Sequence, residues 1–174
     1  MDLLKHLRTV PNFPKEGIEF FDITTILQNP EAFRYVVDTM AEYIKSVPCD
    51  VIVSLESRGF LFASAVAYKL GISHALVRKP GKLPYKTISQ SYSLEYGTDT
   101  VEMHEDAVAP GQNVVIVDDL LATGGTIGAA IKLVEKLGGK VSGLSFFIEI
   151  EGLGGREKLE GYEINSILKL QENI

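Results

Sequence analysis

The chain alternates between short apolar runs and longer segments whose apolar residues recur at helical spacing. Residues 30–46 show that spacing, and Asn29 followed by Pro30 suits the start of a helix. Two more helices are expected at 60–70 and 127–137. Buried strands are expected at 51–55, 74–77, 113–117, 141–148 and 164–168. Strands that alternate with helices in this way predict an α/β fold with a mostly parallel central sheet flanked by helices.

One region departs from this alternation. Residues 93–96 and 100–103 flank Gly97-Thr98-Asp99, and this pattern predicts an antiparallel hairpin. Residues 80–91, which precede the hairpin, contain glycine and prolines and show little periodicity, so a loop is expected there. Neither a repeat nor a linker divides the sequence, and we expect one domain over residues 1–174.

Composition narrows the possible functions. The chain has 17 Lys and Arg against 23 Asp and Glu, a net charge of −6, which disfavours nucleic acid as a partner. Its single cysteine, Cys49, excludes a disulfide within the chain and suits a reducing compartment. Apolar runs stay below the roughly 18 residues that a membrane span needs. We therefore expect a cytoplasmic protein with no membrane partner.

Ligands of parallel α/β sheets bind at the carboxyl ends of strands, which directs attention to residues 56–59 and 118–126. In the second segment, Asp118 and Asp119 follow a buried strand and precede a small-residue loop that opens a helix. Backbone amides at a helix N-terminus bind phosphate, and the glycines at 124–125 allow close approach. An ordinary strand-turn-helix junction is the alternative, but the paired aspartates favour a ligand site.

These segments resemble a known family. The segment VVIVDDLLATGGT is similar to the phosphoribosyl-pyrophosphate motif of type I phosphoribosyltransferases. The other segments FPKEGIEFFDIT, SLESRGF, VRKPGKLP and SYSLEYGTD resemble, in the same order, the adenine-specific members of that family. The resemblance covers nearly the whole chain. It implies a type I phosphoribosyltransferase-like fold with an N-terminal hood, contributed by about residues 1–28, and a mobile hairpin loop.

The resemblance also implies a reaction, in which phosphoribosyl pyrophosphate and adenine give AMP and pyrophosphate. By this resemblance Asp118 and Asp119 hold the ribose hydroxyls, which ionised carboxylates accept strongly. The loop that holds the 5′-phosphate consists of Ala122, Thr123, Gly124, Gly125 and Thr126. The implied catalytic residues are Glu95, Arg58, Asp118 and Asp119.

Two further segments are implied to bind pyrophosphate. Ser57, Arg58 and Gly59 form a turn that can hold an anion through backbone amides and one guanidinium. The second segment contributes Arg78, Lys79 and Lys82 from a cluster of four positive charges in nine residues. The alternatives are a surface turn with a solvated arginine and a solvated basic loop.

The base site is implied at the hood. Phe20 and Phe21 would pack against adenine and read its edge through backbone groups, with Arg58 nearby. Some family members have arginine where Phe21 stands, and core packing is the alternative role for both phenylalanines. Glu95 is the implied acid or base near the purine, and Tyr96 its neighbour when the hairpin loop closes. An outward-facing strand residue is the alternative for Glu95.

By the same resemblance Mg²⁺ is expected as the cofactor, held mainly by substrate oxygens without dedicated protein ligands. A homodimer is implied in the same way. Two other functions stay open at this stage: a phosphoribosyltransferase for another purine, such as xanthine or hypoxanthine, and a non-catalytic ligand-sensing regulator. A regulator normally carries an added DNA-binding module, whereas here the fold accounts for the whole chain.

Overall fold

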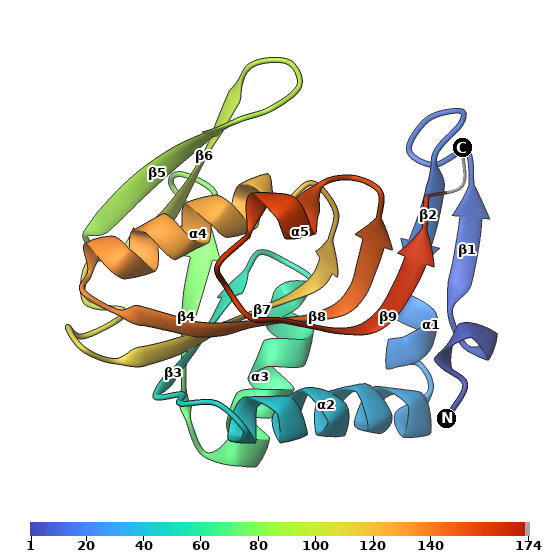
Figure 1. Ribbon diagram of the computed structural model, residues 1–174, viewed down its shortest axis with the longest axis horizontal. Coiled ribbons are helices and arrows are strands. Elements are labelled where there is room, and N and C mark those ends of the chain that lie inside the picture. Colours follow the sequence, from blue (N-terminus) through green and yellow to red (C-terminus); the bar gives the residue numbers. More distant parts are fainter. Residues whose placement is uncertain (173–174) are drawn as a thin grey trace.

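The computed structural model describes residues 1–172 and is built around a seven-stranded sheet with the order β5-β6-β4-β3-β7-β8-β9 (Figure 1). Its strands are β3 (Val51–Leu55), β4 (Ser73–Arg78), β5 (Thr87–Ser93), β6 (Thr98–His104), β7 (Asn113–Leu121), β8 (Lys140–Glu151) and β9 (Ile164–Gln171). The five strands β4, β3, β7, β8 and β9 run parallel, while β5 and β6 form an antiparallel hairpin beside β4. The expected mostly parallel sheet is therefore confirmed.

Three long helices flank the sheet: α2 (Pro30–Lys45), α3 (Gly59–Leu70) and α4 (Gly125–Lys136). The Asn29 side chain accepts hydrogen bonds from the first-turn amides of α2, as its position predicts. The short helices are η1 (Leu3–Lys5), α1 (Thr24–Leu27) and α5 (Gly155–Lys158). Among residues 1–172, no helix is long and apolar enough to cross a membrane.

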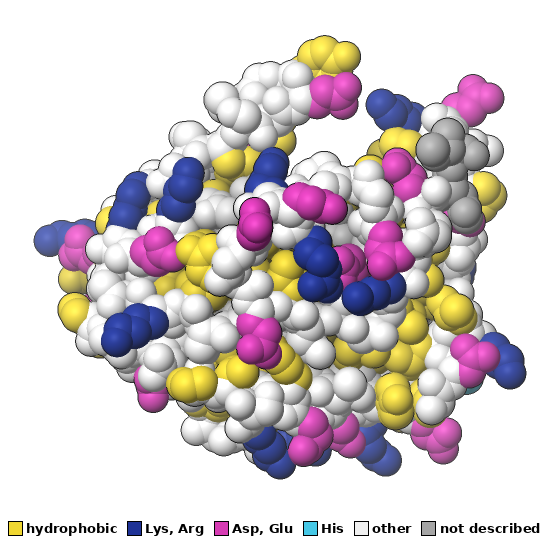
Figure 2. Space-filling model, viewed as in Figure 1, with side chains coloured by type: hydrophobic (Ala, Val, Ile, Leu, Met, Phe, Trp, Pro, Cys, Tyr) yellow, Lys and Arg dark blue, Asp and Glu magenta, His cyan; other side chains and the backbone are white. Residues whose placement is uncertain are grey.

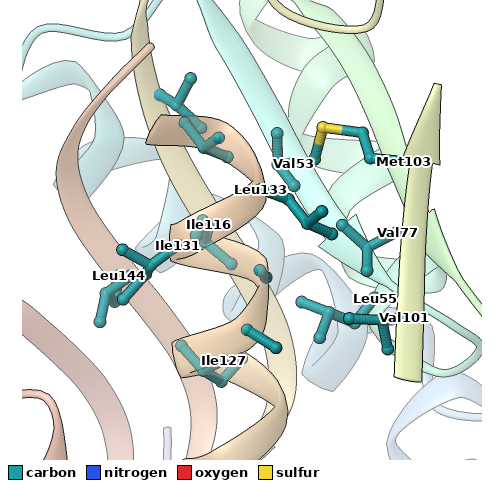
Figure 3. Close-up of a cluster of buried hydrophobic side chains, with 14 of the residues drawn as sticks. Val53, Leu55, Val77, Val101, Met103, Ile116, Ile127, Ile131, Leu133 and Leu144 are labelled. Atoms are coloured by element: carbon teal, nitrogen blue, oxygen red, sulfur yellow. The ribbon is translucent and has the colours of Figure 1, made fainter. Parts of the chain in front are cut away.

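The core lies on both faces of the sheet. Val53 and Leu55 of β3 pack in the cluster that includes α4, and Figure 3 shows Leu133 of α4 facing them. Ile52, which directly precedes Val53, packs in the opposite cluster with α2 and α3. Helices cover both sides of β3, so all five of its residues are buried, which explains its unbroken apolar pattern.

A second, two-stranded sheet precedes the main one. Its strands β1 (Arg8–Pro11) and β2 (Glu19–Asp22) pair antiparallel, with Val10 opposite Phe20, and they lie beside β9 (Figure 1). The hydrophobic pattern does not predict these strands, because they are four residues long and their burial does not alternate. This small sheet is the part of the chain where the resemblance placed the hood.

The hairpin differs from its expected bounds. Residues 94–96, expected in the first strand, form the turn together with Gly97, and the Leu94 N–H donates to the Gly97 carbonyl at 2.9 Å. The first strand, β5, begins at Thr87, so the second half of the expected loop at 80–91 is strand. Much of β5 is exposed, and exposed polar residues such as Ser89 and Ser91 give no apolar alternation to detect.

Candidate active site

The candidate site lies where the strand order reverses. Strand β3 is followed in sequence by β4 on one side of it, and β7 pairs on the other side. Such a switch point opens a crevice at the carboxyl ends of the strands. Arg58 follows β3, Asp119 lies near the end of β7, and the Arg58 Nε donates to the Asp119 Oδ2 at 2.7 Å. This ion pair joins two segments that the sequence analysis selected separately.

The two aspartates lie within the last residues of β7 rather than after the strand, since β7 continues to Leu121. The Asp118 Oδ1 accepts a hydrogen bond from the Asp119 N–H at 2.9 Å. Burial, together with the neighbouring Asp119 carboxylate, raises the pKa of Asp118 well above its usual range. A carboxyl group with a strongly perturbed pKa at the strand ends of a crevice is characteristic of a functional site.

Gly59 explains how the two strand ends can approach each other. A Cβ atom at this position would lie 2.6 Å from the Asp118 Oδ1, a distance that real side chains do not adopt. Gly59 is also the first residue of α3, so the backbone of the turn passes directly beside the carboxylate. Glycine is therefore required here for close packing.

The segment after β7 forms a small cradle at the start of α4. Residues 122–126, together with Asp118, line a pocket of about 120 Å³. Gly124 adopts a φ of 82°, a conformation that favours glycine, and it precedes the helix as its cap. The first amides of a 12-residue helix face this pocket, and such a terminus attracts anions. The Thr126 hydroxyl donates to the Tyr92 hydroxyl at 3.2 Å.

The basic residues at the end of β4 are held by carboxylates in this state. The Glu56 Oε1 accepts the Lys79 backbone N–H at 2.5 Å and lies 3.3 Å from the Arg78 Nε. The Arg78 guanidinium also lies over the Phe60 ring, 5.9 Å from its centroid. Glu56 thus ties the turn after β3 to the basic segment. Glu56 is not identifiable from the sequence, because a lone glutamate in a turn carries no spacing signal.

Lys79 joins the basic segment to the hairpin. Its ammonium group pairs with the Asp99 carboxylate, and the Tyr92 hydroxyl donates to Asp99 at 3.2 Å. The bond to Asp99 raises the pKa of Lys79, so the ammonium stays charged. Since Thr126 donates to Tyr92, a polar chain connects both candidate anion-binding segments through β5 and β6. Sequence reasoning missed Tyr92 and Asp99, whose contact depends on the hairpin register that pairs them.

Other predicted site residues lie apart from this crevice. Glu95 and Tyr96 stand in the exposed hairpin turn, where Tyr96 is 87% exposed. Figure 2 shows the hairpin projecting away from the body of the molecule, with an open gap between its tip and the N-terminal segment. Lys82 and Ser57 are also exposed. The structure therefore brings Arg58 together with Asp119 but leaves Glu95 and Tyr96 away from the crevice.

The two phenylalanines of β2 have different surroundings. Phe20 lies under the Arg58 guanidinium, whose central carbon is 5.3 Å from the ring centroid, and contacts Phe13 edge-on. Phe21 packs against the core cluster that contains α2 and α3. A pocket of about 450 Å³ is lined by Val10, Phe13, Phe20, Asp22, Ile23, Thr24 and Arg58. A flat apolar ring beside a pocket that ends at a guanidinium suits a planar heteroaromatic ligand.

Comparisons with known proteins agree with this arrangement. Residues 22–167 match the family model of the phosphoribosyl transferase domain, so the chain belongs to the phosphoribosyltransferase family. The similar curated relatives include the adenine phosphoribosyltransferase of Caldicellulosiruptor saccharolyticus, 55% identical over the full chain and 99% of the relative. That of Acetivibrio thermocellus is 58% identical over 97% of this chain and 99% of the relative.

Solved structures extend the likeness to the fold. The crystal structure of adenine phosphoribosyltransferase from Thermoanaerobacter pseudethanolicus has a TM-score of 0.94 and 51% identity, covering 97% of this chain and 98% of that one. The Saccharomyces cerevisiae enzyme, whose structure contains adenine, has a TM-score of 0.89 and 42% identity, covering 96% and 97%. The type I phosphoribosyltransferase fold expected from the sequence is therefore confirmed.

Proposed function

We propose that the protein transfers the phosphoribosyl group from phosphoribosyl pyrophosphate to adenine, giving AMP and pyrophosphate in purine salvage. The observation that carries this proposal is the Arg58–Asp119 pair at the switch point, between the helix-terminus cradle and the Phe20 pocket. One crevice thus offers adjacent places for a phosphate, a polyhydroxylated sugar and a planar base. The similar proteins from Caldicellulosiruptor saccharolyticus and Thermoanaerobacter pseudethanolicus are both named adenine phosphoribosyltransferase, which supports the proposal.

The sugar would lie over the two aspartates. The carboxyl groups of Asp118 and Asp119 accept hydrogen bonds from the ribose hydroxyls, while residues 122–126 surround the 5′-phosphate. Purine N9 attacks C1′ as pyrophosphate leaves, so the C1′–O bond breaks while the N9–C1′ bond forms, and the ring proton that the purine loses at N7 passes to the Glu95 carboxylate of the closed hairpin. Negative carboxylates beside C1′ stabilise the positive charge that develops on the sugar. The protein contributes positioning and electrostatics without a covalent intermediate.

Adenine would stack on Phe20, where the Arg58 guanidinium lies in this structure. The ligand therefore competes with Arg58 for the ring face, and Arg58 can turn toward the leaving pyrophosphate or the base. Backbone groups of Phe20 and Phe21 read the purine edge, where a carbonyl suits the 6-amino group of adenine. A 6-oxo purine would bring an acceptor against that carbonyl and leave both unpaired.

Pyrophosphate would be bound by Ser57, Gly59 and the basic segment that contains Arg78, Lys79 and Lys82. The carboxylates of Glu56 and Asp99 occupy two of these cations, so pyrophosphate must replace carboxylate partners. The hairpin would then fold toward the crevice and bring Glu95 and Tyr96 to the substrates. Closure excludes water and so suppresses hydrolysis of the activated sugar.

Mg²⁺ fits this site as a companion of the substrate. Within residues 1–172, no group of three or more histidine, cysteine, aspartate or glutamate side chains is placed to hold a metal ion. Asp118 and Asp119 offer carboxylate oxygens, and Mg²⁺ is commonly bound by one or two carboxylates together with substrate phosphates. The ion would neutralise charge on the departing pyrophosphate.

Three broader features belong to the same proposal. The chain acts as one phosphoribosyltransferase domain over residues 1–174, with residues 1–28 forming the hood over the base. It forms a homodimer, as the resemblance implies. Its location is cytoplasmic, which the single, partly buried Cys49 thiol suits.

A base-competition assay tests the substrate. Purified protein with Mg²⁺ and phosphoribosyl pyrophosphate is offered adenine, hypoxanthine, guanine and xanthine together, and the nucleotide products are identified by mass. AMP alone is the expected product, because only adenine presents a donor at position 6. A 6-oxopurine nucleotide would overturn the choice of base, and the absence of any nucleotide would overturn the reaction.

A further inference from the structure

Glu149 is a buried carboxylate for which the proposed chemistry has no use. It lies on β8 with its side chain 5% exposed. Its oxygens accept hydrogen bonds from the Arg156 Nε at 2.9 Å, the Arg156 Nη2 at 2.7 Å and the Ser166 hydroxyl at 2.6 Å. The bonds from Arg156 lower the pKa of Glu149, so the group is ionised at neutral pH. A buried carboxylate that pairs with a guanidinium through two hydrogen bonds fixes the position of the segment to which the arginine belongs.

Arg156 belongs to α5, and α5 packs against the loop of residues 122–126. A Cβ atom at Gly155 would overlap the Ala122 carbonyl oxygen, so the two backbones are in direct contact. From the other side, a Cβ atom at Gly124 would lie 3.2 Å from the Gly155 carbonyl oxygen. The backbone of α5 is therefore a wall against which the loop rests.

Two hollows adjoin the part of the loop that rests on α5. Leu121 and Ala122 line the 120 Å³ pocket on one side and a second pocket of about 180 Å³ on the other, where Glu149 and Arg156 also lie. Glu149 is directly opposite Leu121 in the β7–β8 register. Because α5 contacts the loop backbone between these two hollows, small shifts of α5 reach the loop directly.

We propose that Glu149 is a positioning residue for the loop at 122–126, acting through Arg156 and the backbone of Gly155. The ion pair holds α5 against the loop, and α5 keeps the loop in the shape that receives the 5′-phosphate. This inference rests on the proposed assignment of that loop to the 5′-phosphate. It predicts that loss of the ion pair weakens the binding of ligands that carry the ribose 5′-phosphate. The binding of adenine and of free pyrophosphate should not change.

The Glu149→Gln variant tests this, because it keeps the shape of the side chain and removes the charge. We expect the KM for phosphoribosyl pyrophosphate and the inhibition constant of ribose 5-phosphate to rise about tenfold, or ~1.4 kcal/mol. The KM for adenine and the inhibition constant of pyrophosphate should stay within about twofold. Gly155→Ala should raise the same two constants, since its Cβ pushes on the loop without changing charge.

Two controls make the outcome specific. Glu135→Gln makes the same chemical change at the opposite end of α4, where the carboxylate accepts from the Tyr162 hydroxyl at 2.5 Å, and it should leave all four constants unchanged. The double variant Glu149→Gln with Arg156→Gln should be no worse than Glu149→Gln alone, because the two residues act as one pair.

Failure of this inference and failure of the proposed function give different results. If Glu149→Gln lowers only the unfolding temperature, or shifts all four constants alike, the pair is merely structural and the inference is wrong. If the unmodified protein makes no AMP, or if ribose 5-phosphate does not compete with phosphoribosyl pyrophosphate, the proposed function itself is wrong. Unfolding temperatures measured for every variant separate a misfolded protein from a misplaced loop.

Discussion

At the scale of single residues, the candidate site is built from groups that are unfavourable for folding. Asp118 is the clearest case, because burial and its neighbour Asp119 disfavour its charged form. A group whose pKa is raised by folding stabilises the fold fully only below its unfolded pKa, and that contribution is lost as pH rises through the folded pKa. The fold therefore carries a cost at neutral pH for keeping this carboxylate ready for a ligand.

Asp118→Asn should accordingly raise the free energy of unfolding at pH 7 while lowering activity. The gain arises because the asparagine amide is neutral and so avoids the cost of a buried charge beside Asp119. The gain should shrink as pH falls through the raised pKa of Asp118, because the carboxyl group of the unmodified protein is then protonated and neutral as well. Denaturant unfolding at several pH values measures it. Glu149→Gln removes a carboxylate whose pKa is lowered by folding, so it should lower the free energy of unfolding at pH 7. A destabilised Asp118→Asn would contradict this account.

At the scale of elements, the buried parallel strands and their helices could be predicted from the sequence. The residues at which the strands of the exposed hairpin begin and end could not. Strand β3 is buried on both faces, so its composition alone identifies it. Strand β5 is mostly polar because much of it is exposed, and its limits depend on pairing with β6. The Arg58–Asp119 contact spans 61 positions and follows from strand order, which no local pattern encodes.

The same difference applies to the candidate site. Adjacent aspartates followed by a glycine-rich helix start form a local pattern, so Asp118, Asp119 and the loop at 122–126 could be selected. Glu56 and Glu149 could not, because Glu56 meets Lys79 and Glu149 meets Ser166 only when separate strands align. Their residue type is common in turns and at strand ends, and nothing adjacent in sequence marks them.

Closure of the hairpin is a prediction at this scale, and the chain offers a clean reporter because it contains no tryptophan. Tyr96→Trp places one indole in the exposed turn. If the hairpin folds over bound AMP and magnesium pyrophosphate, the indole leaves water and its emission should shift to shorter wavelength. Tyr68→Trp on α3, a position 92% exposed, is the matched control and should not shift. Equal emission with and without ligands at position 96 would show that the turn stays open.

At the scale of the whole molecule, the base pocket depends on two sheets that are separate in the hydrogen-bond pattern. Phe20 comes from the two-stranded sheet, and Arg58 comes from the end of a strand in the seven-stranded sheet. Neither sheet forms the pocket alone. The position of the small sheet is secured by neighbouring Phe21, which packs into the main core. In the proposed site, adjacent residues on opposite faces of β2 thus divide base binding and docking onto the core between them.

This division predicts opposite consequences for two similar substitutions. Phe20→Ala should raise the KM for adenine by about 5- to 150-fold, since stacking of a base on an aromatic ring is worth ~1–3 kcal/mol, while the free energy of unfolding changes little. Phe21→Ala should instead lower the free energy of unfolding by about 2 kcal/mol, because it opens a void in the partly buried core contact. Steady-state kinetics and denaturant unfolding of both variants decide the matter. If Phe21→Ala also raises the KM for adenine in protein that is still fully folded, its side chain takes part in the base site, and the two faces of β2 do not divide the work.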